Sequence, residues 1–520
     1  MFDALFTTTT EYKKLSHALS GKGACALFGL PASGRAQVYA ALCRQLDKPL
    51  CIVTPGEAEA TRFAADLNTL GIPAAVFPAR DYVLRPIEGT AREYEYRRLA
   101  VLGELVGGRL RAVAVPAEAL TQFTTPKEDF CANTRTLHTG DTLLRDDLLA
   151  ALFGAGYTRR AQVDGPGQFS VRGDIVDIFA PDQKMPVRME FWGDEIDTLH
   201  TFDLTTQRRE DAIDKFYLSP AREVLFGKPA DAAEQLRAFL AKQRGKKKTA
   251  MADCMAADLD LLDGGAVPVN MDKYLAVRYP HPATVLDYFD DPILVAEEPA
   301  SIREADRATA YRRGEELKSL ILDGVLCAGL DNLYADPSYL WSKTGHYRTI
   351  CAENFARSMP DQPLKDIINA PAHTLPAWNG EVAGLLEDLK PLCDAGYTVT
   401  LLAGTDRAAA GLARDLRDKG ILVTTDAAAA PAAGLVQVLA GHLSAGCEFP
   451  FAKYALLTGR AFGETSSQKK KRKKAKDALN SLTEITPGDL VVHQNHGIGR
   501  YAGIQRMAIQ GVTKDYLRIE

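Results

Sequence analysis

The chain lacks an excess of positive charge. Its 520 residues include 62 Lys and Arg against 67 Asp and Glu, and the formal net charge is −5. Because non-specific binding to phosphate backbones needs a cationic surface, this balance excludes a generally polybasic nucleic-acid coat protein. Hydrophobic residues make up 46% and charged residues 25%, which is ordinary globular composition and excludes wholesale disorder.

Other features are missing as well. No apolar run approaches the roughly 18 residues that a membrane-spanning helix needs, and Met1–Phe6 lacks the basic and apolar regions of a signal peptide. The nine cysteines form no CxxC pair, which disfavours a zinc site and is typical of reduced, cytosolic thiols that serve as small apolar residues. We therefore expect a cytoplasmic protein without a membrane partner, built from about three or four domains.

Residues 1–120 alternate apolar runs with helical stretches. The helices are expected over Ala36–Leu46, Glu57–Leu70 and Tyr94–Leu105. The strand-like runs are Ala24–Phe28, Leu50–Val53, Ala74–Phe77 and Ala112–Val115. Strand and helix in this order predict a parallel sheet with right-handed crossovers. Further αβ alternation follows later, with a buried strand expected at Ile293–Ala296, and a strand at Val399–Ala403 before a helix over Asp406–Lys419.

Between Thr158 and Thr206 the pattern of alternating strands and helices gives way to strands alone. Three strands are expected there, antiparallel and joined by short turns: Val171–Phe179, Val187–Trp192 and Glu195–Phe202. Such a sheet packs one face and leaves several side chains available, namely Arg159, Arg160, Arg172, Arg188 and Trp192. Arginine beside exposed aromatic residues is typical of interface hot spots. The alternative interpretation is a sheet face that bears ordinary surface charges.

The glycines Gly29 and Gly34 lie where a phosphate-binding loop would, after the first strand and before the first helix. A working loop needs a Lys for the phosphates and a Ser or Thr for Mg²⁺, but Arg35 and Ala36 occupy these positions. Arg35 is able to touch a phosphate, whereas Ala36 cannot ligand a metal. We interpret the segment as an inherited nucleotide-binding fold without hydrolysis. The alternative is a tight strand-to-helix turn.

Two other patterns resemble ligand sites. Glu297 and Glu298 end an apolar strand, as do the acids that bind Mg²⁺ in the second motif of nucleotide-hydrolysing proteins. The favoured interpretation is a strand end whose two acids are solvated. His493 and His496 have no Cys or third His beside them, so a structural turn is favoured over a metal site. We expect no metal site.

The order of motifs resembles a known family. The Gly29–Ala36 loop, Arg172–Phe179, Glu190–Asp197 and Thr284–Phe289 resemble the excision-repair protein UvrB. They are more similar to the UvrB-like front half of the bacterial transcription-repair coupling factors. UvrB has an intact ATP loop and an aromatic β-hairpin, whereas Asp81–Glu93 is too short for that hairpin. Gly488–Ile504 is similar to the start of the family's RNA-polymerase-interacting module, which is CarD-like with a Tudor/SH3-like fold.

The resemblance implies an α/β multidomain fold: a degenerate RecA/UvrB-like parallel-sheet domain with a small β-rich insert, a further α/β domain and a partial Tudor/SH3-like β module. The implied segments are a domain 1A at 1–125, a docking insert at 126–210, a domain 1B at 211–330, a structural α/β domain of open role at 331–460, a basic linker at 461–484 and the partial module at 485–520. The linker contains Lys469–Lys476, with seven positive charges in eight residues. The 33 residues from Gly488 to Glu520 are fewer than the roughly 50–60 that such a barrel needs, so we expect a C-terminally truncated chain.

The resemblance also implies partners. The positions that match the UvrA-recruiting face are Arg172, Arg188 and Trp192. In the β module, an edge strand at Ile504–Ile509, with Met507 as an apolar contact, is expected to pair with the RNA polymerase β subunit. Double-stranded DNA, ATP and Mg²⁺ are expected mainly in motor domains that this chain lacks, so no cofactor and no catalytic residue are expected here.

Three functions therefore compete. The first is an adaptor for transcription-coupled nucleotide excision repair, which binds RNA polymerase and recruits UvrA as part of an ATP-dependent DNA translocase. The second is a UvrB-type damage-recognition helicase subunit of the excinuclease, which uses nucleotide through Arg35. The third is a DNA-binding scaffold that depends on Lys469–Lys476.

Overall fold

The computed structural model describes residues 7–86, 92–355, 362–378, 382–430, 432–459, 490–493, 497–509 and 512–519. The chain divides into two compact units, Met1–Arg460 and Ala461–Glu520, each of which is described by itself. The predicted linker with Lys469–Lys476 lies outside the described residues, as does His496. Across the helices in these ranges, none is both long and apolar enough to cross a membrane.

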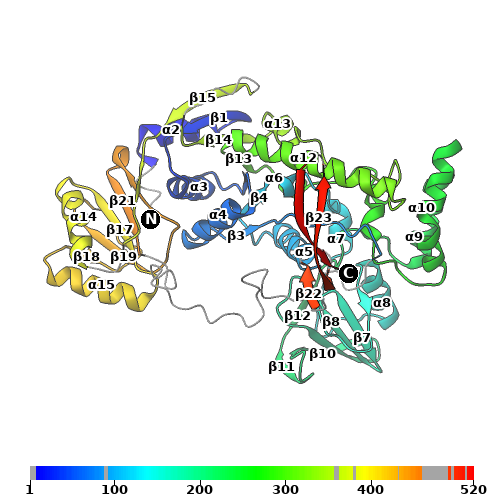
Figure 1. Ribbon diagram of the computed structural model, residues 1–520. Coiled ribbons are helices and arrows are strands. Elements are labelled where there is room, and N and C mark those ends of the chain that lie inside the picture. Colours follow the sequence, from blue (N-terminus) through cyan, green and yellow to red (C-terminus); the bar gives the residue numbers. More distant parts are fainter. Residues whose placement is uncertain are drawn as a thin grey trace. The chain divides into compact units, whose positions relative to one another are not determined.

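A seven-stranded, wholly parallel sheet is the main sheet of the first unit (Figure 1). Its order is β15-β1-β14-β13-β2-β4-β3, and each neighbouring pair is parallel. The strands are β1 (Gly23–Phe28), β2 (Leu50–Thr54), β3 (Ala74–Val76), β4 (Ala112–Pro116), β13 (Ile293–Glu297), β14 (Arg348–Glu353) and β15 (Leu364–Asn369). The predicted parallel sheet and the predicted buried strand at 293–296 are confirmed.

Helices bury both faces of this sheet, which explains why its strands are continuous apolar runs. On one face pack α2 (Thr10–Ala18), α3 (Ala32–Leu46) and α4 (Glu57–Thr69). On the other pack α5 (Glu93–Val106), α6 (Ala117–Leu120), α7 (Lys127–Ala132), η2 (Val285–Tyr288), α12 (Pro299–Leu322) and α13 (Tyr339–Lys343). Alternate residues of one strand reach opposite cores: Ile52 contributes to the first, and Cys51 and Val53 to the second.

Two strands come from a part of the chain that was expected to open a separate domain. β14 lies between β1 and β13, and β15 pairs with the outer side of β1. The predicted boundary at residue 331 therefore divides the sheet. The physical reason is that parallel strands need long crossovers, so a strand can enter the middle of a sheet from far along the chain.

The insert forms a second sheet of six strands, in the order β11-β10-β9-β8-β7-β6. Its strands are β6 (Thr158–Arg159), β7 (Gln168–Arg172), β8 (Ile175–Phe179), β9 (Val187–Trp192), β10 (Glu195–Phe202) and β11 (Arg209–Ala212). All neighbours are antiparallel, as predicted, except the β6–β7 pair. The prediction of one strand over Val171–Phe179 is wrong: Gly173 has φ +60° and turns the chain into a hairpin.

The insert continues past its predicted end at residue 210. β12 (Lys215–Leu218) returns to pair with β5 (Arg135–His138), and α8 (Arg145–Gly154) packs on the apolar face of the sheet. A helical region follows, with α9 (Pro229–Ala241), α10 (Gly245–Asp263), η1 (Met271–Tyr274) and α11 (Leu275–Arg278). Of the segment 81–93, residues 81–86 form neither helix nor strand, and 87–91 lie outside the described residues.

A third, mixed sheet has the order β16-β20-β21-β17-β19-β18. Its strands are β16 (His373–Leu375), β17 (Thr398–Leu402), β18 (Val423–Thr424), β19 (Val436–Leu439), β20 (Gly446–Phe449) and β21 (Tyr454–Thr458), with η3 (Pro450–Ala452) between the last two. One side of it is covered by α14 (Val382–Asp394) and α15 (Asp406–Asp418), which confirms the predicted strand and helix at 399–419. β20 packs on α3, the helix that follows the phosphate-type loop.

The described residues of the second unit form three antiparallel strands, β22 (Leu490–His493), β23 (Gly497–Ile509) and β24 (Val512–Ile519). The three candidate polymerase-contact positions Ile504, Met507 and Ile509 lie on β23 and are paired with β24. β22 extends along β23 only as far as Arg500. Within the described strands, the edge of residues 504–509 that faces away from β24 therefore has no strand partner. The contact with the polymerase stays a prediction.

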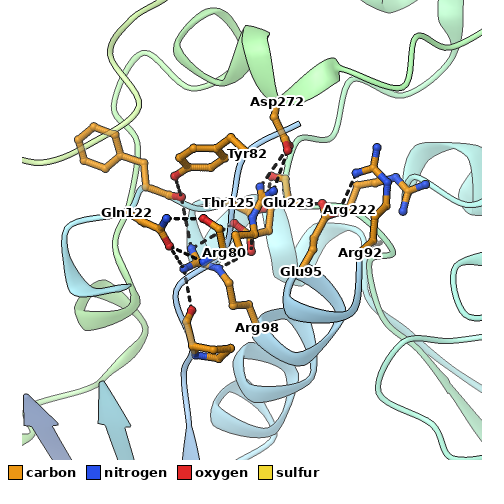
Figure 2. Close-up of polar contacts among 12 residues, drawn as sticks. Arg80, Tyr82, Arg92, Glu95, Arg98, Gln122, Thr125, Arg222, Glu223 and Asp272 are labelled. Atoms are coloured by element: carbon orange, nitrogen blue, oxygen red, sulfur yellow. Dashed lines mark hydrogen bonds and ion pairs between the residues drawn. The ribbon is translucent and has the colours of Figure 1, made fainter. Parts of the chain in front are cut away.

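A network of buried charges joins three parts of the first unit (Figure 2). The carboxylate of Glu223 accepts hydrogen bonds from Arg98 Nε at 2.6 Å and Nη2 at 3.2 Å, and Arg80 Nε lies 3.3 Å from it. Arg80 also donates to both oxygens of Asp272, at 2.7 and 3.1 Å. The network thus ties the segment around residues 80–98 to the chain that leaves the insert and to η1.

Glu95 completes this network. Its carboxylate accepts the backbone N–H of Glu223 at 3.0 Å and pairs with Arg92 at 2.8 Å. Burial alone would raise the pKa of Glu95, but the charges of Arg80, Arg222 and Arg92 outweigh burial and lower that pKa to about 2. Since this pKa is depressed in the folded state, the stabilisation is present above pH about 4.5 and is lost as the pH falls towards 2.

We expect Glu223→Ala to lower the free energy of unfolding by about 3–5 kcal/mol, because it leaves two buried guanidinium groups without their shared carboxylate. Urea unfolding followed by circular dichroism measures the change. Arg97→Ala is the matched control, since Arg97 is exposed and pairs with Glu93 one helical turn away. It should cost about 0.5 kcal/mol or less. Equal losses in the two variants would contradict the proposed importance of the network.

Candidate protein-docking surface

The insert sheet has one apolar and one polar face. Cross-strand pairing puts Arg172 beside Ile175, Asp177 beside Arg188, and Ile175 beside Glu190 on the polar face. The opposite face is buried with α8 and includes Phe169, Val176, Ile178, Val187, Met189, Phe191, Ile196 and Leu199. The predicted packed face is therefore confirmed, and the turn at Gly173 places Val171 and Ile175 on different faces.

Asp177 is the centre of the polar face. Its side chain is almost fully buried and accepts two hydrogen bonds from Arg188, Nε to Oδ1 at 2.7 Å and Nη2 to Oδ2 at 2.9 Å. Arg172 Nη2 donates to the same Oδ2 at 2.6 Å. These hydrogen bonds to Asp177 raise the pKa of Arg188 further, so its guanidinium stays charged. A carboxylate with two arginines is well satisfied inside a sheet face.

The prediction that Arg188 is available at the surface is wrong. The residue is only 9% exposed, its guanidinium lies 4.7 Å from the centre of the Phe202 ring, and Nη1 donates to the carbonyl of Gln207 at 3.2 Å. Asp177 explains this, because a buried carboxylate between apolar neighbours must attract a cation from an adjacent strand. Arg188 therefore holds the polar face together and offers few donors to a partner.

Trp192 and Arg172 remain accessible. Trp192 is 82% exposed at the end of β9, and the side chain of Arg172 is 47% exposed at the end of β7. The backbone N–H of Phe191 donates to the carbonyl of Asp174 at 2.9 Å, so the two turns beside these residues meet at one end of the sheet. An exposed indole next to an arginine with free donors is a suitable protein-docking surface.

Ion pairs within the protein occupy the cation of the phosphate-type loop. Arg35, at the Lys position, is 3% exposed and forms ion pairs with Glu297 (Nε to Oε2, 3.0 Å) and Glu298 (Nη1 to Oε1, 2.9 Å). Tyr39 donates to Glu297 at 2.5 Å. The expectation that both acids are solvated is wrong for Glu297, which is buried, because Arg35 supplies the counter-charge that makes burial possible.

Neighbouring segments also approach the loop glycines. Gly29 has φ +86°, and a Cβ there would lie 3.0 Å from Asn369 Oδ1. A Cβ on Gly34 would lie 2.9 Å from Cys447 Sγ, because β20 packs on the start of α3. Ala36 is buried in the core between α3 and the sheet. Gly34 is thus part of the packing between the first and third sheets, whereas Gly29, Arg35 and Ala36 contact strands or core residues of the first sheet.

Candidate metal and thiol sites are few. The residues that the structure describes contain no group of three or more His, Cys, Asp or Glu side chains able to hold a metal ion. His493 is the last residue of β22. All nine cysteines are free, and burial is the largest cause that raises the pKa of Cys25 and Cys51 to about 12. Such thiols are unreactive core residues.

Comparison with known proteins defines the class of these modules. Residues 136–224 match the UvrB interaction domain, and residues 485–520 match the CarD-like/TRCF RID domain. The chain therefore combines a domain similar to the UvrB interaction domain with one similar to the CarD-like/TRCF RID domain.

Along 95% of its length the chain is similar to proteins named transcription-repair-coupling factor: 27% identity over 508 residues with that of Bacillus subtilis and 26% over 510 residues with that of Staphylococcus haemolyticus. The predicted resemblance is confirmed. The chain spans 43% of the length of these relatives.

The sequence correctly predicts that Arg172 and Trp192 are accessible, but it did not identify Asp177 as the centre of the face. A signal was available, since Asp177 interrupts the apolar run Ile175–Phe179. It missed the pairing of Arg35 with Glu297 because 261 residues separate them along the chain and only the parallel sheet brings β13 next to β2 and near α3. The matched insert at 136–224 also extends beyond the predicted range of 126–210.

We expect Arg188→Ala to destabilise the insert by about 3–5 kcal/mol, since Asp177 then stays buried without its bidentate partner. Arg172→Ala should cost about 1 kcal/mol or less, because Arg188 still satisfies the carboxylate. Hydrogen exchange of the amides in β7, β8 and β9, measured by mass spectrometry, distinguishes the two. Faster exchange in Arg172→Ala than in Arg188→Ala would contradict this account.

Proposed function

We propose that this chain is the recruitment part of a transcription-repair coupling factor, which links RNA polymerase stalled at DNA lesions to nucleotide excision repair. The observation that carries the proposal is that a UvrB interaction domain and a CarD-like/TRCF RID domain match within one chain. In this proposal the insert binds UvrA through Trp192 and Arg172. The β module binds the RNA polymerase β subunit through the edge at Ile504–Ile509.

The geometry of the insert supports the first interaction. Trp192 supplies a large apolar surface that gains by desolvation, and Arg172 has donors beyond the one that bonds Asp177. Arg188 acts indirectly, by fixing Asp177 and hence the orientation of Arg172. The cysteine usage supports a cytoplasmic location.

The closed loop supports an adaptor without its own ATP turnover. In a working site the loop cation contacts phosphates and the strand-end acid acts through Mg²⁺. Here the cation and the acid neutralise each other directly, in the pair of Arg35 with Glu297. DNA binding and ATP-driven translocation are assigned to further domains of the longer relatives, and a UvrB-type helicase subunit is the less favoured alternative.

We expect Trp192→Ala to abolish retention of UvrA in a pull-down with the purified chain, and Arg172→Ala to weaken it by about tenfold or more. Tyr311→Ala is the matched control, because Tyr311 is 74% exposed on α12, outside the insert. It should bind UvrA normally. Unchanged retention in Trp192→Ala, with an intact circular dichroism spectrum, would reject the docking role.

The adaptor function also predicts that ATP turnover by this chain, with DNA and UvrA present, does not exceed the buffer rate. A phosphate-release assay measures this. Arg35→Ala is then expected to change stability and not turnover, because Glu297 loses its buried partner. Turnover that Arg35→Ala abolishes would favour the helicase alternative instead.

A further inference from the structure

The first unit contains a cleft of about 770 Å³ that the proposed function does not use. Its walls come from the start of α5, from β6 with the loop after it, from residues 222–232 and from the loop 265–269 that follows α10. Arg172, Arg188 and Trp192 do not line it, although Gln168, at the other end of β7 on the same face as Arg172, does. The cleft therefore lies apart from the three residues that were predicted to bind UvrA.

The cleft is cationic although the chain as a whole is acidic. Arg159 and Arg160 are exposed, and within the described part of the chain their side chains form no ion pair or hydrogen bond. Among the described residues, Arg222 donates only through Nη1, to the Tyr96 hydroxyl and the Ala221 carbonyl, both at 3.1 Å. Its Nε and Nη2 are left for a ligand.

Asp272 is the acidic residue among those that line the cleft, and both of its oxygens are already bonded to Arg80. Its carboxylate therefore does not pair with Arg159, Arg160 or Arg222. A fourth arginine of the lining, Arg92, is paired with Glu95. Burial would lower the pKa of Arg222, but Glu95, Tyr96 and Asp272 together outweigh burial and the net shift is upward, so this guanidinium stays charged. Three guanidinium groups with unbonded donors thus favour an anionic ligand with several carboxylates or phosphates.

An open strand edge lies in the same cleft. β6 is the outermost strand of the insert sheet. The backbone N–H groups of Thr158 and Arg160 donate to β7, at the carbonyls of Gly167 (2.9 Å) and Phe169 (2.8 Å). Because the backbone alternates along a strand, the N–H and C=O of Arg159 face away from β7, and in the described structure they have no backbone partner.

The apolar groups of the cleft fit a peptide better than a nucleic acid. Val267 and Val269 are 55% and 39% exposed at the rim. The lining has four aromatic rings. Tyr157 and Phe226 are buried, 3% and 7% exposed, the Phe153 ring contacts that of Phe169, and the Arg222 guanidinium lies over the Tyr96 ring. None of them is therefore a free platform on which bases can stack. Aliphatic groups beside an open strand edge and arginines are the features that an extended, acidic chain recognises.

We propose that this cleft binds an extended acidic peptide segment of a partner protein, which adds as a strand to β6. The backbone of Arg159 hydrogen-bonds the peptide main chain. The guanidinium groups of Arg159, Arg160 and Arg222 bind its carboxylates, and Val267 and Val269 contact its apolar side chains. Charge complementarity selects acidic over basic segments, and the strand edge selects polypeptide over nucleic acid.

Fluorescence anisotropy with the whole chain tests the proposal. The probe is a fluorescein-labelled dodecapeptide of alternating Glu and Val, with the Lys-Val peptide and an oligodeoxythymidylate of equal length as comparisons. We expect saturable binding of the Glu-Val peptide alone, weakened about tenfold or more by combining Arg159→Glu with Arg160→Glu. Arg208→Glu is the matched control, since Arg208 is exposed on the same insert and does not line the cleft.

Arg159→Pro tests the backbone contact separately. It removes the outward N–H but no bond of the β6–β7 ladder, so it should weaken the peptide while the circular dichroism spectrum and UvrA retention stay unchanged. Three results would overturn the proposal: no saturable binding of the Glu-Val peptide, an equal loss with Arg208→Glu, or tighter binding of the oligonucleotide. The last result would make the cleft a nucleic-acid groove.

Discussion

The first unit depends on one buried carboxylate, that of Glu223. It lies where the chain leaves the insert, and it neutralises Arg98 and Arg80, which in turn hold Gln122 and Asp272. Removing charges from water costs several kcal/mol for each ion, so this arrangement persists only because every member has a partner. The insert and the helical region therefore cannot be displaced from the main sheet without exposing unpaired charges (Figure 2).

The same rule operates at the two places that resemble functional sites. Glu297 captures Arg35 in the phosphate-type loop, and Asp177 captures Arg188 on the insert. In each case a buried acid converts an arginine that looks available into an internal structural group. What remains for partners is the set of arginines that keep guanidinium donors unbonded to a buried acid. Arg172 retains spare donors, and Arg159, Arg160 and Arg222 line the cleft.

This distribution suits an adaptor. Its nucleotide-type fold serves as a rigid support, because β20 packs on the helix after the loop and the loop cation is already paired. The sequence left the role of the third sheet open, and the structure gives it a structural role. The sheet covers α3 and α4, and Asp66 of α4 accepts two hydrogen bonds from Ser444, at 2.8 and 2.6 Å. The groups that we propose to bind other proteins lie instead on the edges and turns of the insert sheet, where backbone and side chains are still open.

The sequence by itself determined the local elements, the parallel class of the first sheet, the antiparallel insert and the exposed Trp192, since apolar periodicity and turn residues act over short distances. Its family motifs also pointed to the docking insert and the CarD-like module. Only the tertiary structure decided which distant strands join one sheet, as β14 and β15 do, and which arginines are neutralised. Those outcomes depend on contacts between residues far apart in the chain and on the cost of burying charge, and neither leaves a periodic signal in the sequence.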